Sequence, residues 1–185
     1  MARKFFLWSS VDDDSAKYVV TRLLSLDSED SSEEIVLYIN SPGGAVHDGM
    51  AIYDAMQAIS APVSTVCTGL AASMGAVLLA CGQEGRRFTW PHARIMIHQP
   101  SGGYHGSAAD VEVAAKEILH IREKLNHIIA DHTGQSVDKI SEDVDRDRFM
   151  SPAEAVDYGL IDSVLEGPVQ TTESKPADSD TPEAS

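Results

Sequence analysis

Ser73 stands in a run of small residues that suits a serine nucleophile. The segment Gly69–Gly75 reads Gly-Leu-Ala-Ala-Ser-Met-Gly, and the apolar run Ala76–Ala80 follows it. A serine attacks a carbonyl only when its oxygen is accessible, a base removes its proton and hydrogen-bond donors meet the oxyanion. A helix opening at Ser73 directs free N–H groups toward such a reaction centre. The Ala-x-Ser-x-Gly pattern is close to a nucleophile elbow, although it is also typical of a serine that caps a buried helix.

His98 is a candidate for the base. It follows the short apolar segment Ala93–Ile97 and precedes Gln99-Pro100. Because proline cannot donate a hydrogen bond to a strand ladder, we expect the strand to end at His98. Active-site side chains of layered α/β folds often emerge at strand ends, but a structural histidine fits the same position. Taken with Ser73, the pattern favours a nucleophile–base pair.

A third group must orient the imidazole, and one short segment offers three carboxylates. They are Asp143, Asp145 and Asp147, interleaved with Arg146 and Arg148. The residues alone do not choose among the three. A solvated loop with ion pairs is the other interpretation of this charge pattern.

Alternating strands and helices must bring these residues together. The sequence predicts strands over Phe5–Leu7, Ile35–Ile39, Val63–Cys67, Arg87–Thr89 and Arg94–Ile97. It predicts helices over Asp12–Leu26, Val46–Ile59 and Ser107–His132, the last ended by Thr133-Gly134. We interpret Phe5–Trp8 as a buried strand. The alternation implies an α/β fold in which helices cover parallel strands.

Composition limits the classes of protein that the chain can represent. Its 185 residues are 43% hydrophobic, enough for one domain with a substantial core. A formal charge of −15 argues against a nucleic-acid partner, because phosphate contacts need clustered lysine and arginine. No apolar run approaches the ~20 residues that span a bilayer, so we expect a cytoplasmic protein with no membrane association.

The last segment of the chain differs in composition from the rest. Residues 167–185 hold four acids and three prolines but few apolar side chains. Such a segment buries too little surface to order itself, so we predict a folded domain over residues 1–166 and a disordered acidic tail over residues 167–185. Cys67 and Cys81 lie in apolar segments and are expected to be reduced, buried thiols. No cluster with metal-ligand spacing accompanies them, and we expect no metal and no cofactor.

Several longer motifs occur in an order that is known from one family. They are Tyr38–Gly44, Gly49–Asp54, Ala71–Gly75, Met96–Pro100, His132–Gly134, Arg146–Ser151 and Tyr158–Asp162. Over roughly residues 3–165 the chain resembles the proteolytic subunit of the Clp protease, a serine peptidase with a crotonase-like fold. That resemblance implies a spiral of ββα units with a protruding handle helix, which the long helix near Ser107–His132 matches.

The resemblance also implies roles for individual residues. Ser73 matches the nucleophile, His98 the general base and Asp147 the orienting acid. Gly44 and Met74 match the two residues whose backbone N–H groups form the oxyanion hole.

Two further groups follow from the resemblance. Gly102, Gly103 and Tyr104 match the loop that pairs with extended substrate, where close backbone approach suits strand addition. Asp145 and Arg146 match residues that pair across rings and couple assembly to the geometry of the catalytic residues.

The implied partners are those of a compartmentalised protease. Family subunits form two stacked seven-membered rings, a tetradecamer, which here is homomeric or mixed with a paralogue. They act on unfolded polypeptides together with an ATP-dependent AAA+ unfoldase such as ClpX, ClpA or ClpC. Val36 and Ala58 stand where family members carry aromatic residues for unfoldase docking, which puts that docking in question.

The resemblance predicts a serine endopeptidase that cuts unfolded polypeptides into short peptides. A catalytically silent ring subunit that serves assembly is one alternative. A crotonase-fold acyl-CoA enzyme is another, but it needs no serine–histidine pair.

Overall fold

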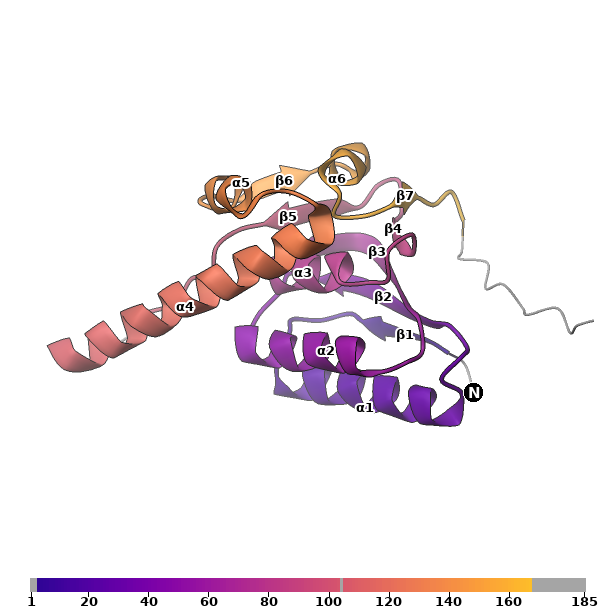
Figure 1. Cartoon of the computed structure of the whole chain (residues 1–185), viewed down its shortest axis with the longest axis horizontal. Coiled ribbons are helices and arrows are strands. Elements are labelled where there is room, and N and C mark those ends of the chain that lie inside the picture. Colours follow the sequence, from indigo (N-terminus) through magenta and orange to yellow (C-terminus); the bar gives the residue numbers. More distant parts are fainter. Residues whose placement is uncertain (1–2, 104, 168–185) are drawn as a thin grey trace, which may run out of the picture.

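The chain forms an α/β structure built around one sheet, which confirms the expected fold class (Figure 1). The computed structural model describes residues 3–103 and 105–167. The strands are β1 (Lys4–Leu7), β2 (Ile35–Ser41), β3 (Val63–Ala72), β4 (Arg87–Thr89), β5 (Arg94–Ile97), β6 (Arg148–Met150) and β7 (Ser163–Val164). The helices are α1 (Asp13–Glu29), α2 (Val46–Ala58), α3 (Met74–Ala80), α4 (Ala108–Thr133), α5 (Val137–Asp143) and α6 (Pro152–Tyr158). Tyr104 and the predicted tail from residue 168 onward lie outside the described residues.

The sheet is parallel with one exception. Its order is β1-β2-β3-β4-β7, and β5 pairs with the second half of β3. Only β6, which pairs with β5, runs antiparallel among the described strands. Parallel strands joined through helices bring their carboxyl ends to one edge, where loop residues from distant parts of the chain meet.

Strand β3 is longer than the sequence predicts, and on one side it pairs with two different strands. It pairs with β4 through Thr65–Cys67 and with β5 through Leu70–Ala72. Between these stretches the register with β2 shifts, and Asn40 Oδ1 accepts a hydrogen bond of 3.2 Å from Leu70 N–H. The expected strand end at Cys67 is therefore wrong, because β5 provides a second set of partners that extends β3 to Ala72.

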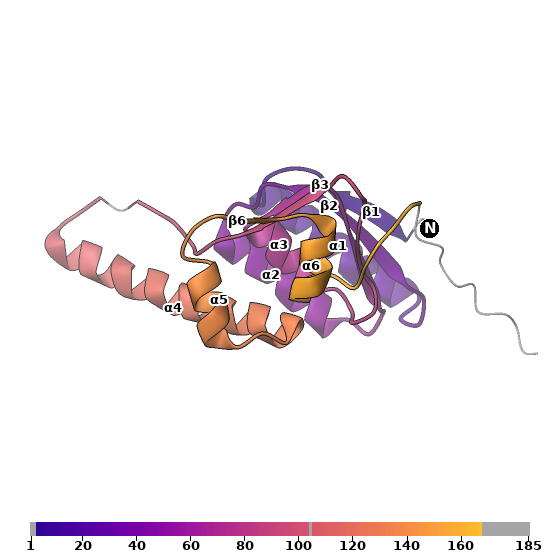
Figure 2. The same cartoon turned by 90° about the horizontal axis from the view of Figure 1, so that it is seen from above.

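The helix ends follow local side-chain chemistry. Asp12, Ser107 and Ser151 cap α1, α4 and α6, each in a reciprocal capping box with the residue three positions later. The last residue of α4 is Thr133, one later than predicted, and Gly134 ends the helix in a left-handed conformation, as the Thr133-Gly134 stop predicts. Figures 1 and 2 show α4 projecting away from the body, as expected for a handle helix. Of the helices in the described ranges, none combines the length and apolarity needed to cross a bilayer.

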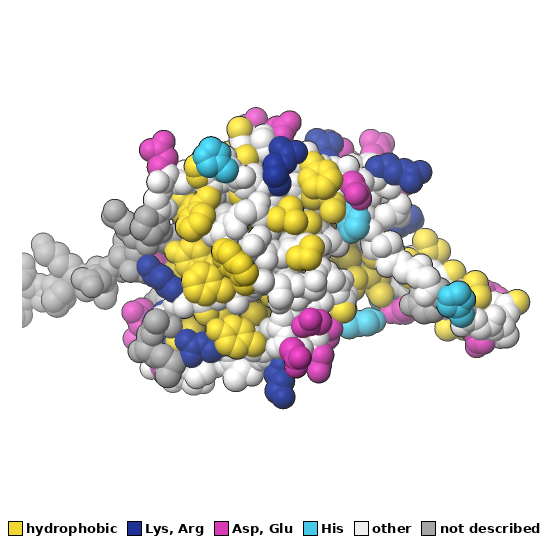
Figure 3. All heavy atoms as spheres, turned by 180° about the vertical axis from the view of Figure 1, so that it is seen from behind, with side chains coloured by type: hydrophobic (Ala, Val, Ile, Leu, Met, Phe, Trp, Pro, Cys, Tyr) yellow, Lys and Arg dark blue, Asp and Glu magenta, His cyan; other side chains and the backbone are white. Residues whose placement is uncertain are grey.

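Helices cover one face of β2, and aromatic side chains cover the other. Ile35, Leu37 and Ile39 belong to the main core, while Val36 and Tyr38 belong to a separate cluster on the opposite face. Figure 3 shows hydrophobic side chains gathered on the rear of the molecule. They include an aromatic row in which ring centroids lie 5.9 Å apart for Trp8 and Phe6, 5.3 Å for Phe6 and Tyr38, and 6.4 Å for Tyr38 and Trp90.

This face corrects one sequence interpretation. Residues 5–8 do not form a fully buried strand, because β1 is at the edge of the sheet and alternates its side chains. Phe5 and Leu7 are buried, whereas Phe6 is 51% and Trp8 56% exposed. Hydrophobic composition alone did not distinguish a buried strand from an edge strand with one exposed apolar face.

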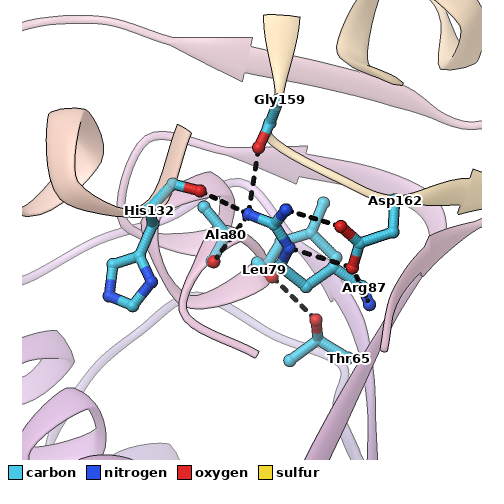
Figure 4. A network of polar contacts seen from close by, with 7 residues as sticks. All are labelled: Thr65, Leu79, Ala80, Arg87, His132, Gly159 and Asp162. Atoms are coloured by element: carbon cyan, nitrogen blue, oxygen red, sulfur yellow. Dashed lines mark hydrogen bonds and ion pairs between the residues drawn. The ribbon is translucent and has the colours of Figure 1, made fainter. Parts of the chain in front are cut away.

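One buried arginine ties the sheet to the ends of three helices (Figure 4). Arg87 binds the Asp162 carboxylate through Nε at 3.0 Å and Nη2 at 2.6 Å. Its Nη1 donates to the carbonyls of Ala80 at 3.5 Å, His132 at 2.5 Å and Gly159 at 2.9 Å. These carbonyls belong to the C-terminal ends of α3, α4 and α6, which have no partners within their own helices. The network fixes the base of the handle helix against the sheet.

Candidate active site

Ser73 forms the whole connection between β3 and α3. Its backbone has φ 55° and ψ −123°, and it has the only positive φ of any non-glycine residue in the described part of the chain. Backbone in such a region costs about 1–3 kcal/mol and persists only where its surroundings hold it. The side chain makes no capping hydrogen bond to α3, so an ordinary helix-capping serine does not describe this residue. A strained strand-to-helix turn that presents a hydroxyl is the geometry of a nucleophile elbow.

The turn at Ser73 rests on Gly43. A Cβ atom at Gly43 would lie 2.6 Å from Ser73 Cβ and 2.7 Å from the carbonyl oxygen of Ala72. The φ of 86° at Gly43 also disfavours any side chain there. Ser41 Oγ accepts a 3.1 Å hydrogen bond from Gly43 N–H and holds this turn in place.

Two backbone N–H groups at this turn have no acceptor among the described residues. Val11 binds Gly43 and Ala45 on either side of Gly44, with N···O distances of 2.9 Å and 2.8 Å, and leaves the Gly44 amide unpaired. A side chain at Gly44 would overlap the backbone of Val11. The Met74 amide is also unpaired, because it is the first residue of α3. A Cβ atom added at Gly43, the residue before Gly44, would lie 3.0 Å from Met74 N, which places this turn at the N-terminal end of α3.

His98 is placed beside Ser73 by strand pairing. Ala72 is opposite Met96 in the parallel pair of β3 and β5, and Ser73 N–H donates to Met96 O at 2.9 Å. Ser73 is therefore the first residue after β3, and His98 is the first residue after the neighbouring strand β5. This position is the one that the sequence predicts for His98.

The antiparallel strand β6 brings one of the three candidate carboxylates to the imidazole. Ile97 pairs with Arg148, so the next position of the ladder sets His98 opposite Asp147. His98 Nδ1 lies 3.1 Å from Asp147 Oδ1. Asp143 and Asp145 instead contact Arg148 and Arg146. A carboxylate at Nδ1 leaves Nε2 as the nitrogen that can accept a proton.

Ser73 and His98, the candidate nucleophile and base, are not hydrogen-bonded to each other in this structure. Within the described residues Ser73 Oγ makes no hydrogen bond to His98, and Asp147 is 62% exposed. Catalytic hydrogen bonds are often long in unliganded structures and shorten when substrate binds.

The other residues expected at the site lie around it. Gly102 and Gly103 are exposed in the irregular segment between β5 and α4, and Tyr104 lies outside the described residues. Arg146 Nε is 3.5 Å from Asp145 Oδ2 of the same chain. At the positions expected for unfoldase docking, Val36 is fully buried and Ala58 is exposed at the end of α2.

Sequence reasoning missed Gln99. Its N–H donates to Val144 O at 2.7 Å, and its Nε2 donates to Asp145 O at 3.1 Å. Gln99 thus ties the segment before Asp147 to the residue that follows His98. Its place next to a candidate base was the only signal in the sequence.

The two cysteines do not compete as nucleophiles. Cys67 and Cys81 are free and buried. Burial raises the pKa of Cys67 to about 11 and raises that of Cys81 further. Since the thiolate is the reactive form, neither thiol is activated at neutral pH.

We therefore expect both thiols of the native protein to resist a disulfide reagent such as dithionitrobenzoate at pH 8. Both should react at once after unfolding in urea. Absorbance of the released thiolate measures the reaction. A fast phase of one equivalent in the native protein would contradict the burial of these residues.

A comparison with protein-family models agrees with this arrangement. The model described as Clp protease matches residues 1–168 of the chain. The match includes β1 through β7 and all of the candidate site residues.

Proposed function

The chain belongs to the Clp protease family, and from this premise we propose that it is a serine endopeptidase with Ser73, His98 and Asp147 as catalytic residues. The observation that carries the proposal is the 3.1 Å contact between His98 Nδ1 and Asp147 Oδ1, at the edge of the sheet where β3 ends immediately before Ser73. The pairing of β3 with β5 and of β5 with β6 supports the proposal, because it sets the ends of these strands, which directly adjoin the three residues, next to one another.

The chemistry follows from the order of these groups. Ser73 Oγ attacks the carbonyl carbon of the scissile peptide bond while His98 Nε2 accepts its proton. His98 then donates this proton to the departing amine, which leaves an acyl ester on Ser73. A water molecule, deprotonated by His98, hydrolyses the ester and restores the serine. Asp147 holds the imidazole in the tautomer that this sequence requires.

The amides of Gly44 and Met74 suit the oxyanion of both tetrahedral intermediates. Each lacks a partner among the described residues, and they lie at the same end of α3, whose dipole favours negative charge there. Donors that are fixed before the reaction need no rearrangement when charge develops. Removing one such donor typically costs about 100- to 1,000-fold in rate.

Family membership implies an oligomeric proteolytic assembly, and we infer two stacked seven-membered rings. Exposed apolar side chains along α4 support a partner-covered helix: Val111 is 45%, Val113 69% and Leu119 53% exposed. The exposure of Asp145 and Arg146 supports their assignment to contacts between rings. We infer unfolded polypeptide as the substrate and an AAA+ unfoldase as the partner that delivers it.

An active-site-directed fluorophosphonate tests the proposal. We expect the assembled protein to be labelled once per chain, with the added mass on the peptide that contains Ser73. Labelling should disappear in Ser73→Ala and in heat-denatured wild-type protein, because both lack an activated hydroxyl. Intact-mass measurement and peptide mapping provide the readout.

The possible results separate the functional classes. A modified Ser73 supports the peptidase. An assembled, folded protein that stays unlabelled supports the silent ring subunit and contradicts the catalytic assignment. Labelling at another serine would place the nucleophile elsewhere.

A further inference from the structure

A second ionic cluster lies immediately beside Asp147. Arg148 Nη1 binds Asp143 Oδ1 at 2.5 Å, and Tyr158 Oη donates to Asp143 Oδ2 at 2.8 Å. Lys139 Nζ binds the same carboxylate oxygen at 2.7 Å. The Asp143 side chain is only 12% exposed. Unlike Asp147, this carboxylate is held by several partners.

Asp143 and Arg148 enclose the segment that carries Asp147. Asp143 is the last residue of α5 and Arg148 the first of β6, so their ion pair closes the four-residue segment 144–147. On its other side this segment is bound by Gln99, through Val144 O and Asp145 O. The acid loop, residues 144–147, is therefore fixed at both of its flanks.

We propose that the Asp143–Arg148 ion pair, here called the acid-loop clamp, positions Asp147 against His98. This inference rests on the proposed catalytic role of Asp147. The clamp residues do not touch substrate; they act through Asp147 and are positioning residues.

Asp147 needs such support because its own contact is weak. At 62% exposure, an ion pair with His98 contributes about 1 kcal/mol or less, too little to order the loop. The clamp is less exposed to solvent and therefore stronger than this contact. Burial alone raises the pKa of Asp143, but hydrogen bonds from Lys139 and Tyr158 and the charge of Arg148 lower the pKa overall. Asp143 is thus ionised at neutral pH and can hold Arg148 at the start of β6.

The clamp is not built for stability alone. Arg148 Nε is buried without a hydrogen-bond partner among the described residues, and such an orphan donor is a cost to folding. An arginine at this position in spite of that cost supports a role in positioning the acid loop. Because Arg148 is opposite Ile97 in the ladder, its position sets which residue faces His98.

Lys139 offers a matched control. Lys139 and Arg148 bind the same carboxylate and lie over the same ring, 5.5 Å and 5.1 Å from the Tyr158 centroid. Only Arg148 closes the acid loop, since Lys139 is within α5. The variants Arg148→Met and Lys139→Met therefore each remove one cation from the cluster but differ in their effect on the loop.

We expect Arg148→Met to lower kcat for a short peptide by about 10- to 100-fold with little change in KM, since small misplacements of catalytic groups have effects of this size. Lys139→Met should keep the wild-type kcat, although we expect it to change the urea midpoint by about as much as Arg148→Met does. In Asp147→Asn, already slowed about 10⁴-fold, adding Arg148→Met should cause no further loss. A merely structural role would instead make the two losses multiply.

Crystal structures of the wild-type assembly and Arg148→Met complete the test independently of activity. We expect the Asp147 carboxylate to leave His98 Nδ1 in the variant. If Asp147 stays at hydrogen-bond distance, or if Lys139→Met is as slow as Arg148→Met, the clamp is wrong. Failure of the catalytic assignment would show itself differently, as wild-type protein that fluorophosphonate does not label at Ser73.

Discussion

Replacing Ser73 or His98 with alanine is expected to lower kcat for peptide cleavage by about a million-fold, and replacing both should cost no more than either alone. Nucleophile and base act as one unit, so loss of either removes the covalent route entirely. What activity is left would come from the oxyanion donors and from substrate binding. Initial rates on a short fluorogenic peptide, measured over a wide range of enzyme concentration, give kcat for the two single variants and the double variant.

The controls for this experiment come from the structure. The Ser73 side chain makes no hydrogen bond in the described residues, so Ser73→Ala should keep the urea midpoint and the oligomeric state of the wild type. Ser60→Ala changes an exposed serine in the loop before β3, at the opposite end of that strand from Ser73, and should retain full activity. Losses that multiply in the double variant, or more than 1% residual rate in Ser73→Ala, would contradict the assignment.

The strands and helices that surround the site could be predicted because they carry strong local signals. Capping residues such as Asp12 and Ser107 mark helix starts, and apolar β-branched runs such as Ile35–Ile39 mark buried strands. The short strand β6 could not be predicted. Arg148-Phe149-Met150 has mixed polarity, and its strand conformation comes from its pairing with β5.

The residues of the candidate site likewise include some that local sequence signals predict and some that they do not. Ser73 and His98 could be identified from their neighbours, whereas local reasoning left Asp143, Asp145 and Asp147 equivalent, and only the family resemblance chose Asp147. The structure favours it through a register, His98 opposite Asp147, that no local pattern encodes. Gly43 and Gln99 were missed because their roles exist only after β2, β3 and β5 are assembled. The substrate role of Gly102 and Gly103 stays a prediction.

Arg87→Ala is expected to lower the free energy of unfolding by about 3–5 kcal/mol, the cost of leaving one member of a buried ion pair without its partner. Arg87 and Asp162 have side chains only 8% and 21% exposed. The loss also strips a donor from carbonyls at the ends of α3, α4 and α6. Urea unfolding followed by circular dichroism, at one fixed protein concentration, measures the change.

The same network predicts a pH dependence. Burial alone raises the pKa of Asp162, but the hydrogen bonds and charge of Arg87 lower it overall. A carboxyl whose folded pKa is depressed contributes stability above its unfolded pKa of about 3.9, and this stability is lost as pH falls toward the folded pKa. The difference in stability between wild type and Arg87→Ala should therefore shrink below about pH 4.

Two further variants separate the ion pair from the bonds to the helix ends. If the pair alone mattered, Arg87→Met with Asp162→Leu would recover most of the stability, since apolar residues often replace a buried pair without loss. We expect little recovery, because the carbonyls of Ala80, His132 and Gly159 would still lack their donor. Arg87→Lys should also fail, because one ammonium group does not reproduce a planar fork of five donors. Full recovery in the double variant would show that the charge on Asp162, rather than the helix ends, requires Arg87.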